Sequence, residues 1–201
     1  MAYIRTSDPR RERRMMQDDR LRPRPMQGDV LATPRSRLRP FERYDLPGLS
    51  RLLADPRVMR HSLHGVQDMA GSRRFLDACR ASYADKGFGY WAVVHPVSRA
   101  LMGFCGFDHE ILDGERELAI GYRYAVHHWG RGLATEVALA VVAHAFAITD
   151  CESLVAVVDP TNVPSSRVAQ NAGFVWESMT TLEGQRVKVY RRHRYREVRS
   201  C

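Results

Sequence analysis

A glycine-rich turn between a strand-like run and a helix-like run is the feature that most constrains this chain of 201 residues. The turn reads His-His-Trp-Gly-Arg-Gly over residues 127–132. It follows the strand-like run Glu117–Val126 and opens the apolar run Leu133–Ile148. Such a turn directs backbone N–H groups and the positive end of a helix dipole towards one point. The sequence therefore predicts a phosphate or pyrophosphate site, and a turn whose glycines only relieve strain is the structural alternative.

The residues around the two glycines separate the known kinds of phosphate-binding turn. A P-loop requires Lys-Ser/Thr after its second glycine, but Leu133 and Ala134 stand there. A dinucleotide-binding turn requires a third glycine where Thr135 stands. It also requires a repeated strand-helix-strand pattern, which this chain lacks. Neither of these two motifs explains the turn.

A second motif, Asn162–Phe174, follows the strand-like run Leu154–Val158. Asn162 suits a helix N-cap, Pro164 fits the first turn, and Gly173 suits the position after the last turn. A plain capped helix would explain this segment alone. Together, however, the two motifs resemble those of the GNAT acetyltransferases. That family writes its loop as Gln/Arg-x-x-Gly-x-Gly/Ala and its helix as Asn-x-x-Ser-x-x-Val/Leu-x-x-Lys/Asn-x-Gly-Phe.

The resemblance covers residues 34–192 and is greatest to the branch that contains the ribosomal-protein alanine/serine N-terminal acetyltransferases. It implies an α/β GNAT fold, in which a mixed central sheet has a splayed acetyl-CoA-binding strand and helices on both faces. It also implies acetyl-CoA as co-substrate, transfer directly to a primary amine, and no acyl-enzyme. In the family, acceptor specificity depends on the region that is here Ala54–Val66 and on the last hairpin.

The resemblance also implies the residues that contact acetyl-CoA. Loop amides would bind the pyrophosphate, and the end of the strand, here Tyr122–Val126, would pair with the pantetheine arm as an added strand. His127 stands where the family has Gln or Arg. A histidine side chain is shorter than either and is mostly neutral at pH 7. The predicted cofactor-binding residues are Tyr122, Tyr124, Val126, His127, Trp129, Gly130, Arg131, Gly132, Leu133, Ala134, Asn162, Ser165 and Arg167.

Amine acetylation requires a base for the amine and an acid for the leaving thiolate. Glu117 resembles the acid of the family's Glu-x-x-Gly-Tyr strand motif and is the predicted base, with a surface salt bridge as its structural alternative. Ser165 is the predicted acid and Ser166 is the other candidate, although either serine could instead be a capping residue and water could replace the acid. The other candidate bases are Asp108, His109 and Glu110.

Side chains alternate along the strand-like run Glu117–Val126. Its even-numbered residues read as core, and small residues at 119, 121 and 125 lie on the other face with Glu117 and Arg123. These small residues would leave space for a ligand or allow close packing of a helix. An enzymatic rival is a ping-pong mechanism on Cys105, for which His109 is the nearest basic residue in sequence.

Composition divides the chain into three parts and restricts its class. Residues 1–33 lack lasting periodicity and are expected to form a flexible basic arm. The acetyltransferase domain is expected to span residues 34–195, and a basic tail is expected at residues 196–201. The net charge of +8 arises at the two ends. Solvated termini explain this charge, and contact with RNA, a ribosome or an acidic protein is the functional alternative.

No apolar run approaches the length of a membrane span, and scattered cysteines favour neither disulfides nor a metal site. The expected location is the cytoplasm, and the expected assembly is a monomer or homodimer. The expected partner is an amine, either a small molecule or a protein N-terminus. A non-catalytic module that binds acyl-CoA or associates with nucleic acid is the alternative function.

Periodicity and turn residues predict the remaining elements. Asp45 is expected to cap a helix, and two hairpins are expected to turn at Asp113-Gly114 and Glu183-Gly184. The other expected helices and strands are Ser36–Phe41, Gln67–Lys86, Gly89–His95, Ala100–Leu112, Ser153–Val158, Val175–Leu182 and Arg186–Tyr195.

Overall fold

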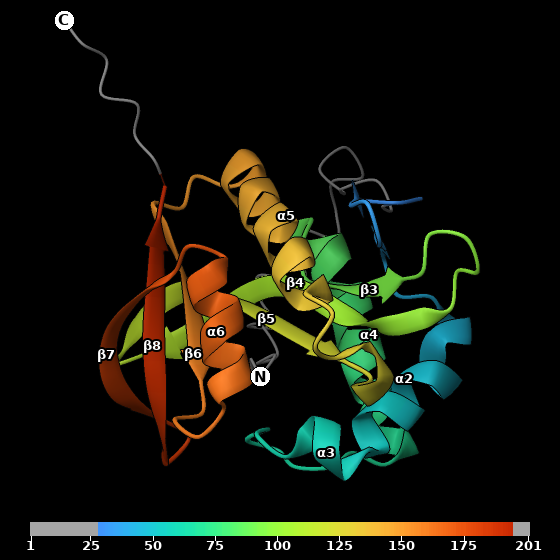
Figure 1. The fold of residues 1–201 in the computed structure, drawn as a ribbon, viewed down its shortest axis with the longest axis horizontal. Helices are drawn as coiled ribbons and strands as arrows, with labels where there is room; N and C mark the ends of the chain where they lie inside the picture. Colours follow the sequence, from blue (N-terminus) through green and yellow to red (C-terminus); the bar gives the residue numbers. More distant parts are fainter. Residues whose placement is uncertain (1–27, 195–201) are drawn as a thin grey trace, which may run out of the picture.

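The computed structural model describes residues 28–194, and one mixed sheet of eight strands runs through this part (Figure 1). The strand order is β1-β2-β3-β4-β5-β6-β8-β7. The strands are β1 (Leu31–Ala32), β2 (Arg37–Arg39), β3 (Tyr90–Val94), β4 (Leu101–Leu112), β5 (Glu115–Tyr124), β6 (Ser153–Val158), β7 (Val175–Leu182) and β8 (Gln185–His193). The helices are α2 (Leu46–Ala54), α3 (Pro56–Met59), α4 (Met69–Lys86), α5 (Leu133–Ile148) and α6 (Val163–Asn171).

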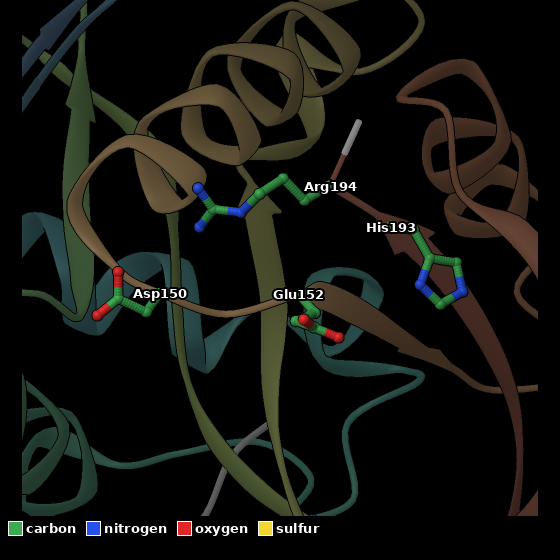
Figure 2. A pocket seen from close by; sticks show the side chains of 4 residues that line it. All are labelled: Asp150, Glu152, His193 and Arg194. Atoms are coloured by element: carbon green, nitrogen blue, oxygen red, sulfur yellow. The ribbon is translucent and has the colours of Figure 1, made fainter. Parts of the chain in front are cut away.

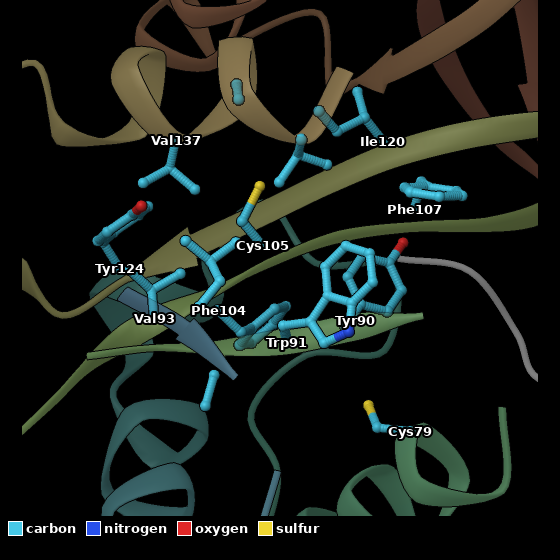
Figure 3. Packing of buried hydrophobic residues seen from close by; sticks show 14 of the residues in the cluster. Cys79, Tyr90, Trp91, Val93, Phe104, Cys105, Phe107, Ile120, Tyr124 and Val137 are labelled. Carbon is cyan, nitrogen blue, oxygen red and sulfur yellow. The ribbon is translucent and has the colours of Figure 1, made fainter. Parts of the chain in front are cut away.

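Helices cover both faces of the sheet, as the resemblance implied. In Figure 1, α5 and α6 lie in front of the strands and α4 lies behind them. Figure 3 shows Val137 of α5 and Cys79 of α4 on opposite sides of the strands. Ring contacts identify the two faces, because Trp91 packs on His144 of α5, whereas Tyr90 packs on Phe75 of α4. One hydrophobic core therefore fills both layers.

The two predicted hairpin turns are confirmed. The backbone φ angle is +51° at Asp113 and +89° at Gly114, and it is +50° at Glu183 and +78° at Gly184. Two successive residues with positive φ form the turn whose twist matches that of paired strands. The sequence therefore placed both hairpins correctly.

Residues 28–33, which were expected to belong to a flexible arm, are part of the body. Leu31 pairs with Leu38 as β1 joins β2, and Asp29 forms an ion pair with Arg99 at 2.6 Å. A strand of two residues is too short to leave a periodic signal, so the sequence assigned these residues to the arm. The rest of the expected arm, residues 1–27, and the expected tail lie outside the described residues.

Asp45 precedes α2 as expected, but its side chain does not cap the helix. Its carboxylate oxygens accept hydrogen bonds from both terminal nitrogens of buried Arg39, at 2.7 and 2.8 Å. A buried guanidinium is costly without a counter-charge, so this pair prevails over the cap. Helix α3 was not predicted, although Asp55 caps it and Pro56 begins it.

Strands β5 and β6 are parallel but pair at only two positions. Ala119 is opposite Val155, and Ile120 is opposite Ala156. Beyond these pairs the two strands separate towards their C-terminal ends, so a gap opens in the sheet at the end of β5. This gap is the splayed feature that the GNAT resemblance implied. No helix of the described part is long and apolar enough to cross a membrane.

Gly121 lies on the α4 face of β5, where the sequence allowed either space or close packing. A Cβ atom there would lie 2.8 Å from Cε1 of Tyr90, a ring that is 5% exposed. The Tyr90 ring therefore fills the space over Gly121, although it comes from strand β3 and not from a helix, as the sequence had suggested. We expect Gly121→Ala to lower the free energy of unfolding by about 1–3 kcal/mol in denaturant titrations, because the core is overpacked. Adding Tyr90→Leu should restore part of the loss, and an unchanged midpoint for Gly121→Ala would contradict this packing.

Candidate active site

The glycine loop has the geometry of an anion site. Gly130 and Gly132 have φ angles of +70° and +75°, and Gly132 is the N-cap of α5. The backbone N–H groups of residues 130–135 donate to no acceptor within residues 28–194. They surround the positive end of a helix of 16 residues, where an anion would be stabilised.

Arg35 holds this loop against α5. Its Nε and backbone N–H donate to the carboxylate of Glu136 at 2.6 and 3.0 Å, and its Nη1 donates to the carbonyl of Arg131 at 2.8 Å. Arg131 itself is exposed, as is His127. Arg35 thus fixes the loop to α5, and the backbone amides of the loop remain open to a ligand.

The backbone at the end of β5 is available for strand-like pairing. The N–H of Ala125 donates to the carbonyl of Met102 on β4 at 3.0 Å. Because alternate residues of an antiparallel strand direct their backbone groups to opposite sides, Tyr122 and Tyr124 direct theirs towards the gap. The indole Nε1 of Trp129 donates to the Tyr124 carbonyl at 2.8 Å, so that one acceptor is already used.

Val126 was expected to belong to this strand, but β5 ends at Tyr124 and Val126 begins a 3-10 turn over residues 126–128. The half-exposed Trp129 directly follows this turn. Leu133 buries its side chain in the core, so among the predicted loop residues it can offer a ligand only its backbone.

A hydroxyl pair closes the gap on the α6 side. The Tyr122 hydroxyl lies 3.0 Å from Oγ of Ser165 and donates to the Ser165 carbonyl at 2.9 Å. Burial raises the pKa of Tyr122. Sequence reasoning missed this hydroxyl because Tyr122 read as a core residue and α6 contains no tyrosine.

Asn162 acts as the predicted cap of α6, because its Oδ1 accepts a hydrogen bond from the N–H of Ser165 at 3.1 Å. The structure thus brings Asn162 and Ser165 together at the start of α6, beside Tyr122. Arg167 is exposed further along the same helix. The cap fixes the Ser165 hydroxyl relative to the end of β5.

The structure places Glu117 away from the glycine loop, near the N-terminal end of β5. Both carboxylate oxygens are engaged by Arg191, at 2.8 and 3.0 Å. Glu117 lines a hollow of about 420 Å³ together with residues 149–153, which lead into β6. The structure thus forms the salt bridge that the sequence left as the alternative, and the role of Glu117 as a base stays a prediction.

The other three candidate bases lie on β4 in distinct surroundings. Asp108 is 2% exposed and pairs with Lys86 at 2.6 Å. His109 packs edge-on against the ring of Phe88, and burial lowers the pKa of its imidazole. Burial raises the pKa of the Glu110 carboxyl, which lies opposite Glu117 on β4.

The ping-pong rival on Cys105 finds no support in the structure. Cys105 is fully buried on the α5 face, and burial raises the pKa of its thiol. Neither accessibility nor thiolate character favours it as a nucleophile.

A segment that includes α3 spans the open gap between β5 and β6. Arg123, on β5, donates to the carbonyl of Val58 at 3.1 Å. His61 follows Val58 by three residues. Its Nδ1 lies 3.1 Å from Oδ2 of Asp159, which directly follows β6. This His–Asp pair joins residues 98 positions apart, so no local pattern could have predicted it.

Asp159 is well placed to orient an imidazole. Burial raises its pKa, but hydrogen bonds from Thr161 and His61 outweigh this effect and lower the pKa below the ordinary value. The carboxylate therefore remains charged and favours a proton on Nδ1 of His61, which leaves Nε2 as the acceptor. The pair lies at the C-terminal end of β6, because Asp159 directly follows that strand.

A second hollow, of about 440 Å³, lies beside the first at the N-terminal end of β6, and Asp150 and Glu152 line both. Figure 2 shows the four side chains that line it, Asp150, Glu152, His193 and Arg194. Arg194 is held there by the carbonyls of Cys151 and Thr149. None of the predicted site residues lines this hollow, so it is separate from the candidate site.

Comparisons with known proteins agree with this geometry. Residues 35–175 match the Acetyltransferase (GNAT) domain family. The chain is 30% identical to the uncharacterized protein YkkB of Bacillus subtilis over 166 residues, which cover 82% of this chain and 96% of that protein. The chain belongs to the GNAT acetyltransferase family.

Solved structures show the same fold. An acetyltransferase from Agrobacterium tumefaciens matches with a TM-score of 0.71 and 27% identity, over 84% of this chain and 96% of that one. RimL, a ribosomal L7/L12 alpha-N-protein acetyltransferase solved in complex with coenzyme A, matches with a TM-score of 0.67 and 19% identity. This second match covers 83% of this chain and 98% of RimL.

Proposed function

We propose that this protein transfers the acetyl group of acetyl-CoA directly to a primary amine of a small molecule or a protein N-terminus. The observation that carries the proposal is the open run of amides at residues 130–135, next to a gap into which β5 directs free backbone groups. An anion site beside the open edge at the end of β5 suits a ligand that has both a pyrophosphate and an amide-containing arm. The RimL structure contains coenzyme A, which further supports this assignment.

The hydroxyl pair is our candidate for protonating the leaving thiolate. Ser165 alone is a weak acid, but the Tyr122 hydroxyl beside it supplies a second donor at the gap. A proton passed to the sulfur from this pair would complete the transfer without any acyl-enzyme.

We expect the double variant Tyr122→Phe, Ser165→Ala to lower kcat about tenfold, the value of one hydrogen bond of about 1.4 kcal/mol. Water can occupy the vacated space, so the loss should stay moderate, and the affinity for acetyl-CoA should change little. Ser166→Ala, which alters the next residue of α6, is the matched control. Wild-type kcat in the double variant would remove the pair from the mechanism.

For the base, the geometry favours His61 over Glu117. The His61 imidazole is oriented by Asp159 and has an unoccupied Nε2 within the described residues, whereas both oxygens of Glu117 are held by Arg191. Imidazole is also the usual proton acceptor near neutral pH. The segment that carries His61 lies within the region 54–66, where the family's acceptor specificity resides.

For the acceptor, we propose an α-amine rather than a lysine side chain. An α-amine has a pKa of about 7.7–8.0 and a lysine of about 10.4, so the lysine costs about 3.4 kcal/mol more to deprotonate at neutral pH. We expect a peptide with a free N-terminus to be acetylated at least about tenfold faster than an N-blocked peptide with one lysine. Preferential acetylation of the lysine in direct competition would overturn this assignment.

A non-catalytic module that binds acyl-CoA or associates with nucleic acid is the alternative function. The excess positive charge near both chain ends would suit an acidic partner such as a ribosome. The ordered hydroxyl and His–Asp pairs favour catalysis, because simple binding requires neither. We place the reaction in the cytoplasm, where acetyl-CoA and newly made N-termini are both present.

A further inference from the structure

Arg123 is a partly buried cation at the open end of β5 that has no carboxylate partner within residues 28–194. Its Nη1 donates to the carbonyl of Val58 and lies 2.8 Å from Sδ of Met59. Its Nε and Nη2 have no acceptor among the described residues. Buried Arg39, in contrast, donates two hydrogen bonds to the carboxylate of Asp45. A desolvated charge normally has such a partner, because removing it from water is costly.

The strand register shows which way Arg123 faces. It lies opposite Phe104 on β4, and the Phe104 ring packs 5.0 Å from that of Phe75 on α4. Arg123 therefore points to the α4 face, away from α5 and the glycine loop. It also belongs to the part of β5 that borders the gap, three residues beyond Ile120, the last one paired with β6.

Carboxylates elsewhere on this face do not satisfy Arg123. Asp108 pairs with Lys86, and Glu117 pairs with Arg191. Burial lowers the pKa of the Arg123 guanidinium to about 10, which still leaves it charged at neutral pH. A permanent positive charge thus stands beside the gap without a counter-charge from the described part of the protein.

We propose that Arg123 binds a carboxylate of the acceptor substrate and thereby presents the amine of that substrate to the gap. This inference rests on the proposed function, because it names the class of acceptor. With Nη1 engaged by Val58, the free Nε and Nη2 groups form the planar edge that binds a carboxylate side-on through two hydrogen bonds. The single positive charge of a guanidinium also matches the single negative charge of a carboxylate. A phosphate ester is a poorer match, because its negative charge approaches two. The acceptors are therefore α-amino acids, or peptides that have an acidic residue near the N-terminus.

The test compares acceptors that differ only in this charge. Initial rates would be measured with acetyl-CoA and free amino acids against their amides, and with peptides containing Asp or Glu at position two against Asn or Gln. We expect the wild-type kcat/KM to be at least tenfold higher for the carboxylates. The less basic amine of an amino acid amide works against this result, so the preference cannot arise from amine ionisation in those pairs.

Substitutions then assign the preference to one side chain. Arg123→Gln should abolish it, and Arg123→Lys, which keeps the charge but loses the planar edge, should retain only part. Arg116→Gln, an exposed residue of the same strand, is the matched control and should keep the full preference. Equal rates for acids and amides in the wild type, or an undiminished preference in Arg123→Gln, would overturn the inference.

A binding measurement separates this inference from the proposed function. The CoA complex would be titrated calorimetrically with N-acetyl amino acids and with their amides, which need no turnover to bind. We expect at least tenfold tighter binding of the acids by the wild type and no such difference for Arg123→Gln. Turnover of neutral amines without any preference would defeat only the carboxylate site, whereas absence of turnover on every amine would defeat the proposed function. Equal binding of acids and amides would reject the carboxylate site whichever of these results is obtained.

Discussion

Gly132→Asp is expected to weaken acetyl-CoA binding at least about 100-fold, which corresponds to about 2.8 kcal/mol. Gly132 has a φ angle of +75° and forms the N-cap of α5, where the open amides converge. Aspartate would strain this backbone and place a carboxylate where the pyrophosphate must approach. Calorimetric titration with acetyl-CoA measures the loss directly.

The hairpin glycine Gly184 is a matched control for backbone strain. It has a φ angle of +78° and open space around its Cβ position, but it lies in the β7–β8 turn. Gly184→Asp should therefore bear a similar conformational cost and keep the affinity for acetyl-CoA. If Gly132→Asp folds and binds acetyl-CoA as the wild type does, the loop is not the pyrophosphate site.

His61→Ala is expected to lower kcat at neutral pH by about 10²–10⁴-fold, the usual contribution of a general base. The loss should shrink as the pH rises, because an acceptor amine that has already lost its proton needs no base. Binding of acetyl-CoA should stay within about twofold of the wild type, since His61 follows α3 and belongs neither to the glycine loop nor to the end of β5. A pH–rate profile between pH 6 and about 10 distinguishes this role from a structural one.

Two further variants make the base assignment specific. His64 belongs to the same loop and lies 3.7 Å from the carboxylate of Glu183, so His64→Ala removes a comparable contact between a histidine and a carboxylate without touching Asp159. We expect this variant to keep its activity. Glu117→Gln tests the base that the sequence favoured. A large loss with recovery at high pH in Glu117→Gln, together with wild-type kcat in His61→Ala, would return the role to Glu117.

The sequence predicted those parts of the site that depend on local chemistry. The glycine loop, the Asn162 cap and both hairpin turns each follow from residue types within a few positions of one another. Their backbone requirements are met by few residues, so the pattern is visible without a fold. The long apolar run that forms α5 was predicted for the same reason.

The sequence could not predict the contacts that join distant segments. The Tyr122–Ser165 pair and the His61–Asp159 pair form only when the gap between β5 and β6 brings separate elements together. The pairing of Glu117 with Arg191 likewise depends on the position of β8 beside β6. Helix α3 did leave a local signal, since Asp55 and Pro56 form a cap and a first helical position.

The most direct test of acetyl transfer is a single assay of the purified full-length chain with acetyl-CoA and a panel of amines. The panel would contain amino acids, peptides with free N-termini and neutral small-molecule amines, and both released CoA thiol and acetylated product would be measured. We predict CoA release in equal amount to N-acetyl product, above the rate of hydrolysis without amine. Tight binding of acetyl-CoA with no acetylated product from any amine would contradict the proposed transferase and favour the non-catalytic acyl-CoA-binding module.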